Sequence, residues 1–307
     1  MSTASSSPAA VTTARVSFSP WRVWTMALAT MTQLMRMKIL PFLVLFCILL
    51  VGVSFGFSAF NPEQQLSQLK TWSLGSLQLF SIVFGIVATA LLLPKDIEDR
   101  TLYTILSKPV PRFDYLLGKL CGVLLLIASG LLIMDAMLSL ILWMQQHLLF
   151  DAAIAHLEAD KQATPEAVAQ LKAIVARQGL TWNLHWAVFA IFLKAAVVTT
   201  LTLLISCISS STLFTIVIAF CMTIIGHGQS LIREFFFQPH LGATAKRIAS
   251  LALASIAPDL AQFDIVDSVV NGEIVPLAAV YEMSGIAAMY ITVYLFVTHL
   301  VFAEKEL

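Results

Sequence analysis

Two charged residues lie inside long apolar runs of this sequence, where a charge needs an explanation. Asp135 falls within the run Leu120–Met144, and Lys194 falls within the run Trp186–Cys207. A lone charge in hydrocarbon costs about 2.5–3.5 kcal/mol on insertion scales. Asp135 lies about nine residues before the end of its run, and Lys194 about eight residues after the start of its run. At 1.5 Å per residue, both then lie about 12–14 Å below the same, outer membrane boundary. We expect an ion pair between adjacent antiparallel helices. A polar lining of a substrate path and independent contacts with water stay open as alternatives.

Motifs of common enzyme and metal sites are missing from the sequence. It contains no G-x-x-x-x-G-K-[ST] phosphate loop, no H-E-x-x-H and no G-x-S-x-G. The six histidines show no metal-ligand spacing, although His227 could line a gate at the end of its apolar run. The cysteines lie in or beside apolar runs and are interpreted as packing residues: Cys47, Cys121, Cys207 and Cys221. We therefore expect a chain that is not an enzyme and binds no cofactor or metal itself.

The densest polar segment is residues 94–119, which read PKDIEDRTLYTILSKPVPRFDYLLGK between two apolar runs. Residues 96–106 can form three turns of an amphipathic helix with its apolar side chains on one side. Because Pro109 disfavours helical geometry at Lys108, the helix is expected to stop near Ser107. On composition alone, the segment is equally well interpreted as a solvated loop that lies on the lipid surface.

The string RTLYTILSKPVPRFDYLLGK within this segment resembles a block in the membrane subunits of ABC-2-type transporters. The shared pattern is an acidic start, Arg-Thr-Leu, Ser-Lys-Pro-Val, a following Arg, and Gly-Lys. In that family the loop is the coupling helix, which docks into a groove on the ATPase subunit. The resemblance implies that ATPase coupling involves Asp96, Ile97, Glu98, Arg100, Thr101, Leu102, Leu106, Ser107, Lys108, Pro109 and Arg112.

This resemblance implies a permease subunit of an ATP-binding cassette transporter, and we expect an exporter. ATP and Mg would be bound by a separate ABC ATPase dimer. A second copy of the chain, or a homologous permease, would complete the pore. Two other interpretations stay open: a non-transporting membrane scaffold that recruits a cytoplasmic partner, and a secondary transporter. The substrate stays open among lipid, glycan, drug, peptide and metal-related cargo.

Composition places the chain in a membrane. Hydrophobic residues make up 59% of 307 residues, and the mean hydropathy of +0.87 is too high for a soluble domain. Basic and acidic residues number 18 each, so net charge predicts no nucleic-acid partner. We expect an all-α, polytopic fold with six transmembrane helices inside a domain of residues 39–307. The expected spans are about 39–60, 72–93, 120–144, 186–207, 213–232 and 282–303.

Small residues in the second span suggest a packing surface. Ser81, Gly85 and Thr89 lie four residues apart, a spacing that lets two helices approach closely. The same stripe could instead line a translocation path, although packing is the favoured interpretation.

The remaining segments are expected outside the six spans, and the apolar stretch 248–256, too short to cross, is expected to be re-entrant or interfacial. Residues 1–18 are predicted to be a disordered tail, and residues 19–38 an interfacial amphipathic helix. Extracytoplasmic inserts are expected at 145–185 and 233–281. In the first, a helical hairpin is expected to end at Gly179 in the left-handed conformation. The second contains residues 258–272, which are similar to the region before the last span in related permeases.

Basic residues near the spans set the expected orientation. Four lie in residues 1–38 and five in residues 94–119, whereas the first loop on the opposite side carries only Lys70. The positive-inside rule then places the coupling loop and both termini in the cytoplasm. We expect a multi-pass protein of the cell membrane, specifically a bacterial inner membrane.

Overall fold

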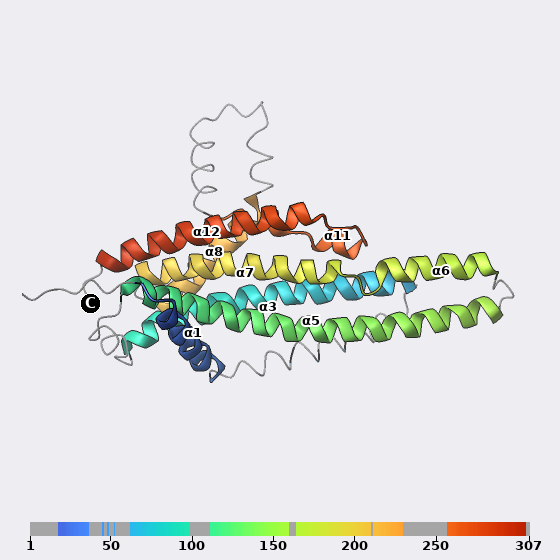
Figure 1. The fold of residues 1–307 in the computed structure, drawn as a ribbon, viewed down its shortest axis with the longest axis horizontal. Coiled ribbons are helices and arrows are strands. Elements are labelled where there is room, and N and C mark those ends of the chain that lie inside the picture. The colour runs from blue at the N-terminus through green and yellow to red at the C-terminus, as the bar shows by residue number, and fades with distance from the viewer. Residues whose placement is uncertain are drawn as a thin grey trace, which may run out of the picture.

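A computed structural model describes residues 18–36, 45, 48, 52, 62–98, 111–159, 164–209, 211–229 and 257–304. Every element in these ranges is helical, which confirms the predicted all-α class for this part of the chain. The elements are α1 (Pro20–Met35), α3 (Pro62–Glu98), α5 (Arg112–Ala159), α6 (Pro165–Gln178), α7 (Asn183–Ile208), α8 (Thr212–His227), η1 (Leu260–Phe263), α11 (Val266–Val270) and α12 (Leu277–Glu304). The helices α3, α5, α7 and α12 run along the long axis of the molecule, and α1 crosses α5 obliquely (Figure 1).

Four helices are long and apolar enough to cross a membrane, and they correspond to four of the six predicted spans. They are Gln65–Leu92 of α3, Arg112–Ala155 of α5, and the whole of α7 and α12. The predicted span 213–232 contains α8, an apolar helix of 16 residues, fewer than the ~20 that a straight crossing needs. Apart from residues 45, 48 and 52, the predicted span 39–60 lies outside the described residues.

The helices extend beyond the apolar runs from which the spans were predicted. With 48 residues, α5 is about 72 Å long, more than twice the ~30 Å of bilayer hydrocarbon. Its far end lies beside α6, so the predicted external hairpin is built from the continuation of a membrane helix (Figure 1). Gly179 does not take the expected left-handed φ. A Cβ there would lie 2.8 Å from the Val175 carbonyl oxygen, so this position favours glycine.

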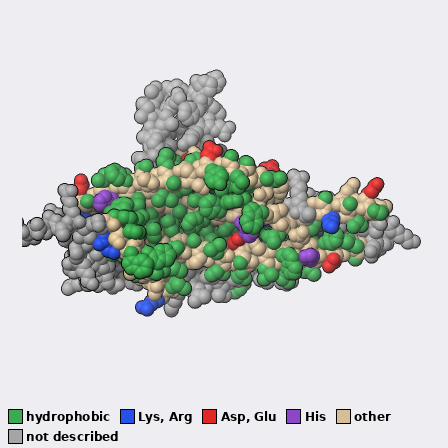
Figure 2. All heavy atoms as spheres, in the orientation of Figure 1, with side chains coloured by type: hydrophobic (Ala, Val, Ile, Leu, Met, Phe, Trp, Pro, Cys, Tyr) green, Lys and Arg blue, Asp and Glu red, His purple; other side chains and the backbone are tan. Residues whose placement is uncertain are grey.

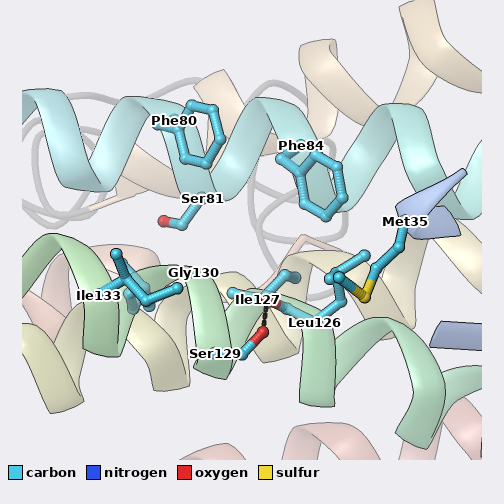
Figure 3. Close-up of a pocket in the computed structure, with 10 residues that line it drawn as sticks. Met35, Phe80, Ser81, Phe84, Leu126, Ile127, Ser129, Gly130 and Ile133 are labelled. Atoms are coloured by element: carbon cyan, nitrogen blue, oxygen red, sulfur yellow. Dashed lines mark hydrogen bonds between the residues drawn. The ribbon is translucent and has the colours of Figure 1, made fainter. Parts of the chain in front are cut away.

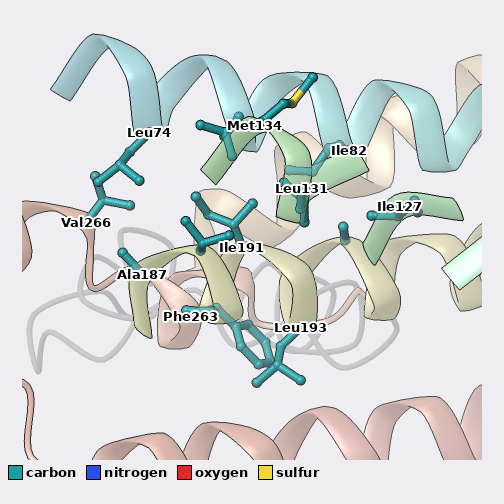
Figure 4. Close-up of a cluster of buried hydrophobic side chains, with 14 of the residues drawn as sticks. Leu74, Ile82, Ile127, Leu131, Met134, Ala187, Ile191, Leu193, Phe263 and Val266 are labelled. Carbon is teal, nitrogen blue, oxygen red and sulfur yellow. The ribbon is translucent and has the colours of Figure 1, made fainter. Parts of the chain in front are cut away.

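The helix α7 forms the centre of the bundle. Its sequence is apolar all round, which is the pattern of a helix enclosed by others. It contacts α3, α5, α8, α12 and η1, and most of its residues are buried. Figure 4 shows Ala187, Ile191 and Leu193 of this helix within the main buried hydrophobic cluster, to which α3, α5, η1 and α11 also contribute.

The small-residue stripe in α3 is a packing surface, as predicted. Ser81 and Thr89 are buried, and Gly85 faces α7. A Cβ built at Gly85 would lie 2.5 Å from Thr199 Oγ1 and 3.3 Å from Ile127 Cδ1, so only glycine permits this approach of α3, α5 and α7.

A second close contact joins α1 to α5. A Cβ at Gly118 would lie 3.2 Å from the Val23 carbonyl oxygen, and one at Gly122 would lie 2.7 Å from the Ala27 carbonyl oxygen. The two glycines therefore let the backbone of α1 rest directly on α5.

Exposed tryptophans mark two levels along the bundle. Trp24 and Cys121 line one groove at the end that holds α1, here called the α1 end. The opposite end, which holds α6, is here called the α6 end. Trp143 marks it, because Trp143 lies one turn from Gln146, whose Oε1 accepts a hydrogen bond from the Leu180 N–H just after α6. Cys121 and Trp143 are separated by 22 residues, about 33 Å of helix, which matches the hydrocarbon thickness. Hydrophobic side chains cover much of the visible face between these levels (Figure 2).

Candidate functional site

The buried Lys194 of α7 has an acidic partner, Asp264, which directly follows η1. Lys194 Nζ lies 3.6 Å from Asp264 Oδ2. The lysine side chain is 1% exposed, whereas the Asp264 side chain is 46% exposed. The distance is too long for a hydrogen bond, and Lys194 Nζ has no hydrogen-bond partner among the described residues. The pair therefore joins a fully enclosed cation to a carboxylate that is half-exposed on the surface of the single chain.

The second intramembrane charge is bound by a histidine. His185 Nδ1 donates a hydrogen bond to Asp135 Oδ2 at 2.7 Å. The other oxygen, Asp135 Oδ1, is buried and has no hydrogen-bond partner in the described part of the chain. Trp182 packs edge-on against the His185 ring at 5.1 Å between centroids. This pair ties α5 to the start of α7.

The expected pair between Asp135 and Lys194 is wrong, because the two side chains lie on opposite sides of α7. Asp135 reaches His185, and Lys194 follows nine residues later on the same helix. Nine residues amount to two and a half turns, which points Lys194 away from α5 and toward Asp264. Lys194 also lies nine residues, about 13 Å along the axis of α7, from His185, the residue that Asp135 binds.

The segment 257–264 is irregular backbone packed among helices. It holds the short η1 and contacts both α7 and α8. Gly226 of α8 permits this packing, because a Cβ there would lie 2.6 Å from the Pro258 carbonyl oxygen. The Asp259 N–H donates to the Tyr290 hydroxyl of α12 at 3.2 Å, and Gln229 donates to the Ala257 carbonyl. These contacts satisfy backbone groups that no regular ladder covers.

This irregular segment lies at membrane depth and exposes polar groups. Lys194 is eleven residues from the start of α7, about 16 Å along the axis, so its partner Asp264 lies near mid-span. Gln262 and Asp264 are exposed, while Phe263 between them is buried. Non-helical backbone is tolerated at that depth only where protein buries it or where it borders a water-filled cavity.

Other features near this segment serve packing. His227 donates from Nδ1 to the Thr223 carbonyl at 2.9 Å, and its Nε2 lies 3.3 Å from Gln78 Nε2 on α3. This histidine therefore joins α8 to α3. Among the described residues, no three His, Cys, Asp or Glu residues are grouped as metal ligands.

A groove between α3 and α5 is almost entirely apolar. Phe80 and Phe84 stack along α3 with ring centroids 6.0 Å apart, and Met35 closes one end (Figure 3). The two serines in its lining turn their hydroxyls to backbone carbonyls of their own helices, Ser81 to Gln78 and Ser129 to Leu126. The groove has no group that could perform chemistry.

The predicted coupling residues fall into three sets. Asp96, Ile97 and Glu98 are the last residues of α3, which runs through Pro94 without a break. Arg112 begins α5 and is described in full. The others lie outside the described residues: Arg100, Thr101, Leu102, Leu106, Ser107, Lys108 and Pro109.

Arg112 and Asp114 hold the start of α5 to two other helices. Arg112 Nη1 donates to the carbonyls of Phe302 at 3.1 Å and Ala303 at 2.6 Å, at the end of α12. Asp114, 1% exposed, accepts from Arg22 Nη2 at 3.1 Å and Arg22 Nε at 3.2 Å. A displacement of the segment before Arg112 would therefore be passed to α1, α5 and α12 together.

Sequence reasoning missed the two partners, His185 and Asp264. The helical period offered one signal, because Lys194 and His185 differ by half-integral turns and cannot both face Asp135. Asp264 carried no comparable signal, because only folding brings the loop after η1 to mid-span.

The chain matches no protein-family model, and no curated protein matches it significantly.

Proposed function

We propose that the chain is the permease subunit of an ATP-binding cassette transporter of the ABC-2 type, and that it works as an exporter. The observation that carries the proposal is the polar segment around Asp264 at membrane depth. A scaffold that only recruits a partner has no need for an exposed carboxylate near mid-span, and placing one there is costly. A transporter needs such polar surface to replace the water around its substrate.

The ATPase-docking part of the proposal rests on the resemblance of residues 94–119 to a coupling helix. In this account the segment from Asp96 to Ser107 docks on a separate ATPase. ATP binding closes the ATPase dimer and moves the segment as a rigid body. Arg112 and Asp114 support this route, because their contacts extend from the start of α5 to α12 and α1. The resulting movement switches the bundle between two states of differing ATP affinity.

The proposed assembly has two permease subunits, identical or homologous, above one ATPase dimer. The proposal keeps six spans, with residues 39–60 and the region of α8 as the two beyond the four long apolar helices. Both termini and the α1 end face the cytoplasm of a bacterial inner membrane. ATP and Mg are bound by the partner, and the substrate class is left open.

Purification of the tagged full-length chain in mild detergent, followed by mass spectrometry and an ATPase assay, tests the proposal. We expect a phosphate-loop ATPase to co-purify, and to be lost when Leu102→Asp and Leu106→Asp are combined. A matched control is Leu148→Asp plus Leu180→Asp, which alters two exposed leucines that lie beyond the apolar run of α5 and far from the loop. Recovery of the chain without any ATPase across several detergents would contradict the proposal and favour the scaffold.

A further inference from the structure

The helix α3 contains a lysine that the structure encloses completely. Lys70 is 0% exposed and is one of the largest fully buried side chains of the protein. It lies five residues after Gln65, where the apolar part of α3 begins, which is about 8 Å along the helix axis. This beginning of α3 lies at the α6 end of the bundle (Figure 1). The α6 end therefore holds a buried amine that the proposed function does not use.

No acidic side chain neutralises Lys70 in the part of the chain that the structure describes. Its Nζ is buried and makes no hydrogen bond to a described residue. Asp135 of α5 and the loop residue Asp264 each bind a side chain of α7 instead. Asp267 of α11 and Glu166 of α6, two further elements that pack on α3, are exposed. Lys70 thus differs from Lys194, the buried lysine that has a carboxylate partner.

The surroundings of Lys70 are apolar. Leu66 and Leu69 on the same part of α3, Leu184 of α7 and Val269 of α11 all belong to the main buried hydrophobic cluster. An ammonium group without a counter-ion is costly in such an interior. A neutral amine would still need a hydrogen-bond partner there. Either form of the side chain therefore calls for a ligand.

A hydroxyl group on the next turn of α3 is equally unused. Ser73 lies three residues after Lys70, on the same side of the helix, and is 0% exposed. Thr71, Ser76 and Ser81 of this helix donate hydrogen bonds to backbone carbonyls of the preceding turn. Ser73 Oγ, in contrast, has no hydrogen-bond partner among the described residues. An ammonium group and a hydroxyl group with free donors suit the same ligand, an anion.

We propose that Lys70 and Ser73 bind a small anion inside the bundle at its α6 end. The anion supplies the negative charge that Lys70 lacks and accepts a hydrogen bond from each side chain. Because both residues are completely enclosed, the ligand is a compact inorganic anion, and chloride is the matching probe. The site is independent of the proposed function, since it involves neither an ATPase nor the pair of Lys194 and Asp264.

Thermal unfolding of the full-length protein in an uncharged detergent tests this site. Sodium chloride would replace sodium gluconate at constant ionic strength, because gluconate is too bulky for an enclosed site. We expect the unfolding temperature to rise with chloride concentration, as it does when a ligand binds only the folded state. Lys70→Met should abolish this rise, whereas Lys194→Met, which replaces a second buried lysine, should retain it. No rise in the wild type, or an equal rise in Lys70→Met, would overturn the proposal.

A second variant keeps the test decisive if Lys70→Met does not fold. Ser73→Ala removes one donor and keeps the charge, so the chloride concentration that gives half of the rise should increase several-fold. Ser76→Ala is the matched control, because the Ser76 hydroxyl is already bound to the Trp72 carbonyl at 2.7 Å. It should leave the half-saturating concentration unchanged. The same concentration in Ser73→Ala and in the wild type would overturn the site.

Discussion

Lys194 and Asp264 form an ion pair of very unequal burial, with Nζ and Oδ2 3.6 Å apart and side chains 1% and 46% exposed. Removing the carboxylate would strand a charge inside the bundle, whereas removing the lysine would leave a carboxylate that is already half-exposed. The free energy of unfolding should therefore respond unequally to the two substitutions.

Asp264→Asn should destabilise the protein by about 3 kcal/mol, because an uncompensated buried charge remains. Lys194→Met should be neutral or stabilising, since an apolar side chain of similar length replaces that charge. The double variant should resemble Lys194→Met alone. Thermal unfolding in detergent measures all three. Equal destabilisation by both single substitutions would show that the pair itself, rather than the buried cation, dominates.

The contact between α3 and α7 should tolerate no side chain at Gly85. Gly85→Ala is expected to destabilise by about 1–3 kcal/mol through overpacking against Thr199 Oγ1. Thr199→Ala removes that oxygen and should restore most of the loss in the double variant. Gly75→Ala on the same helix meets open space and should be neutral or stabilising by up to about 1 kcal/mol. Chemical unfolding curves would settle the comparison, and a harmless Gly85→Ala would contradict the packing.

Docking of α1 should depend on one buried carboxylate. Asp114→Asn removes the charge that binds Arg22 and the Ser19 N–H, so α1 should exchange its amide hydrogens faster while α7 stays protected. Asp151→Asn, at an exposed position of α5, is the matched control. Hydrogen exchange with mass spectrometry reports both helices in one experiment. Unchanged protection of α1 would mean that Gly118 and Gly122 suffice to hold it.

Arg112 should separate ATPase docking from coupling. Arg112→Ala removes two hydrogen bonds to the end of α12 but leaves Leu102 and Leu106 intact. We expect the ATPase to co-purify as before. The change in ATPase rate that the membrane subunit causes should become several-fold smaller. Lys172→Ala, at an exposed site on α6, should change neither property. Loss of co-purification with Arg112→Ala would instead place Arg112 in the docking surface.

The sequence was sufficient for features that depend on local composition. Four apolar helices and the packing role of Gly85 follow from hydrophobic length and small-residue spacing. Helix ends were less predictable. Polar residues beyond Met144 still form helix, because α5 continues into a hairpin with α6 instead of stopping at the membrane surface.

Charge partners depended on the register and rotation of packed helices, which run lengths do not contain. Asp135 and Lys194 lie at comparable distances from the ends of their apolar runs, yet Asp135 of α5 reaches His185 on one side of α7, and Lys194 points to the other side. The partner Asp264 reaches mid-span only because Gly226, Gln229 and Tyr290 hold an irregular segment there. Such tertiary contacts join residues far apart in the chain and leave no periodic pattern.

The most direct test of a water-filled polar path is the accessibility of position 264. In a background with all four cysteines replaced and with Lys194→Met, which leaves no stranded buried charge, Asp264→Cys would be treated in intact vesicles with a membrane-impermeant maleimide. Leu132→Cys is the control, because Leu132 is 67% exposed and lies within the apolar run of α5, eleven residues, about 16 Å, from Trp143. The account predicts fast labelling of Asp264→Cys and little labelling of Leu132→Cys. Labelling of Asp264→Cys no faster than Leu132→Cys would contradict it.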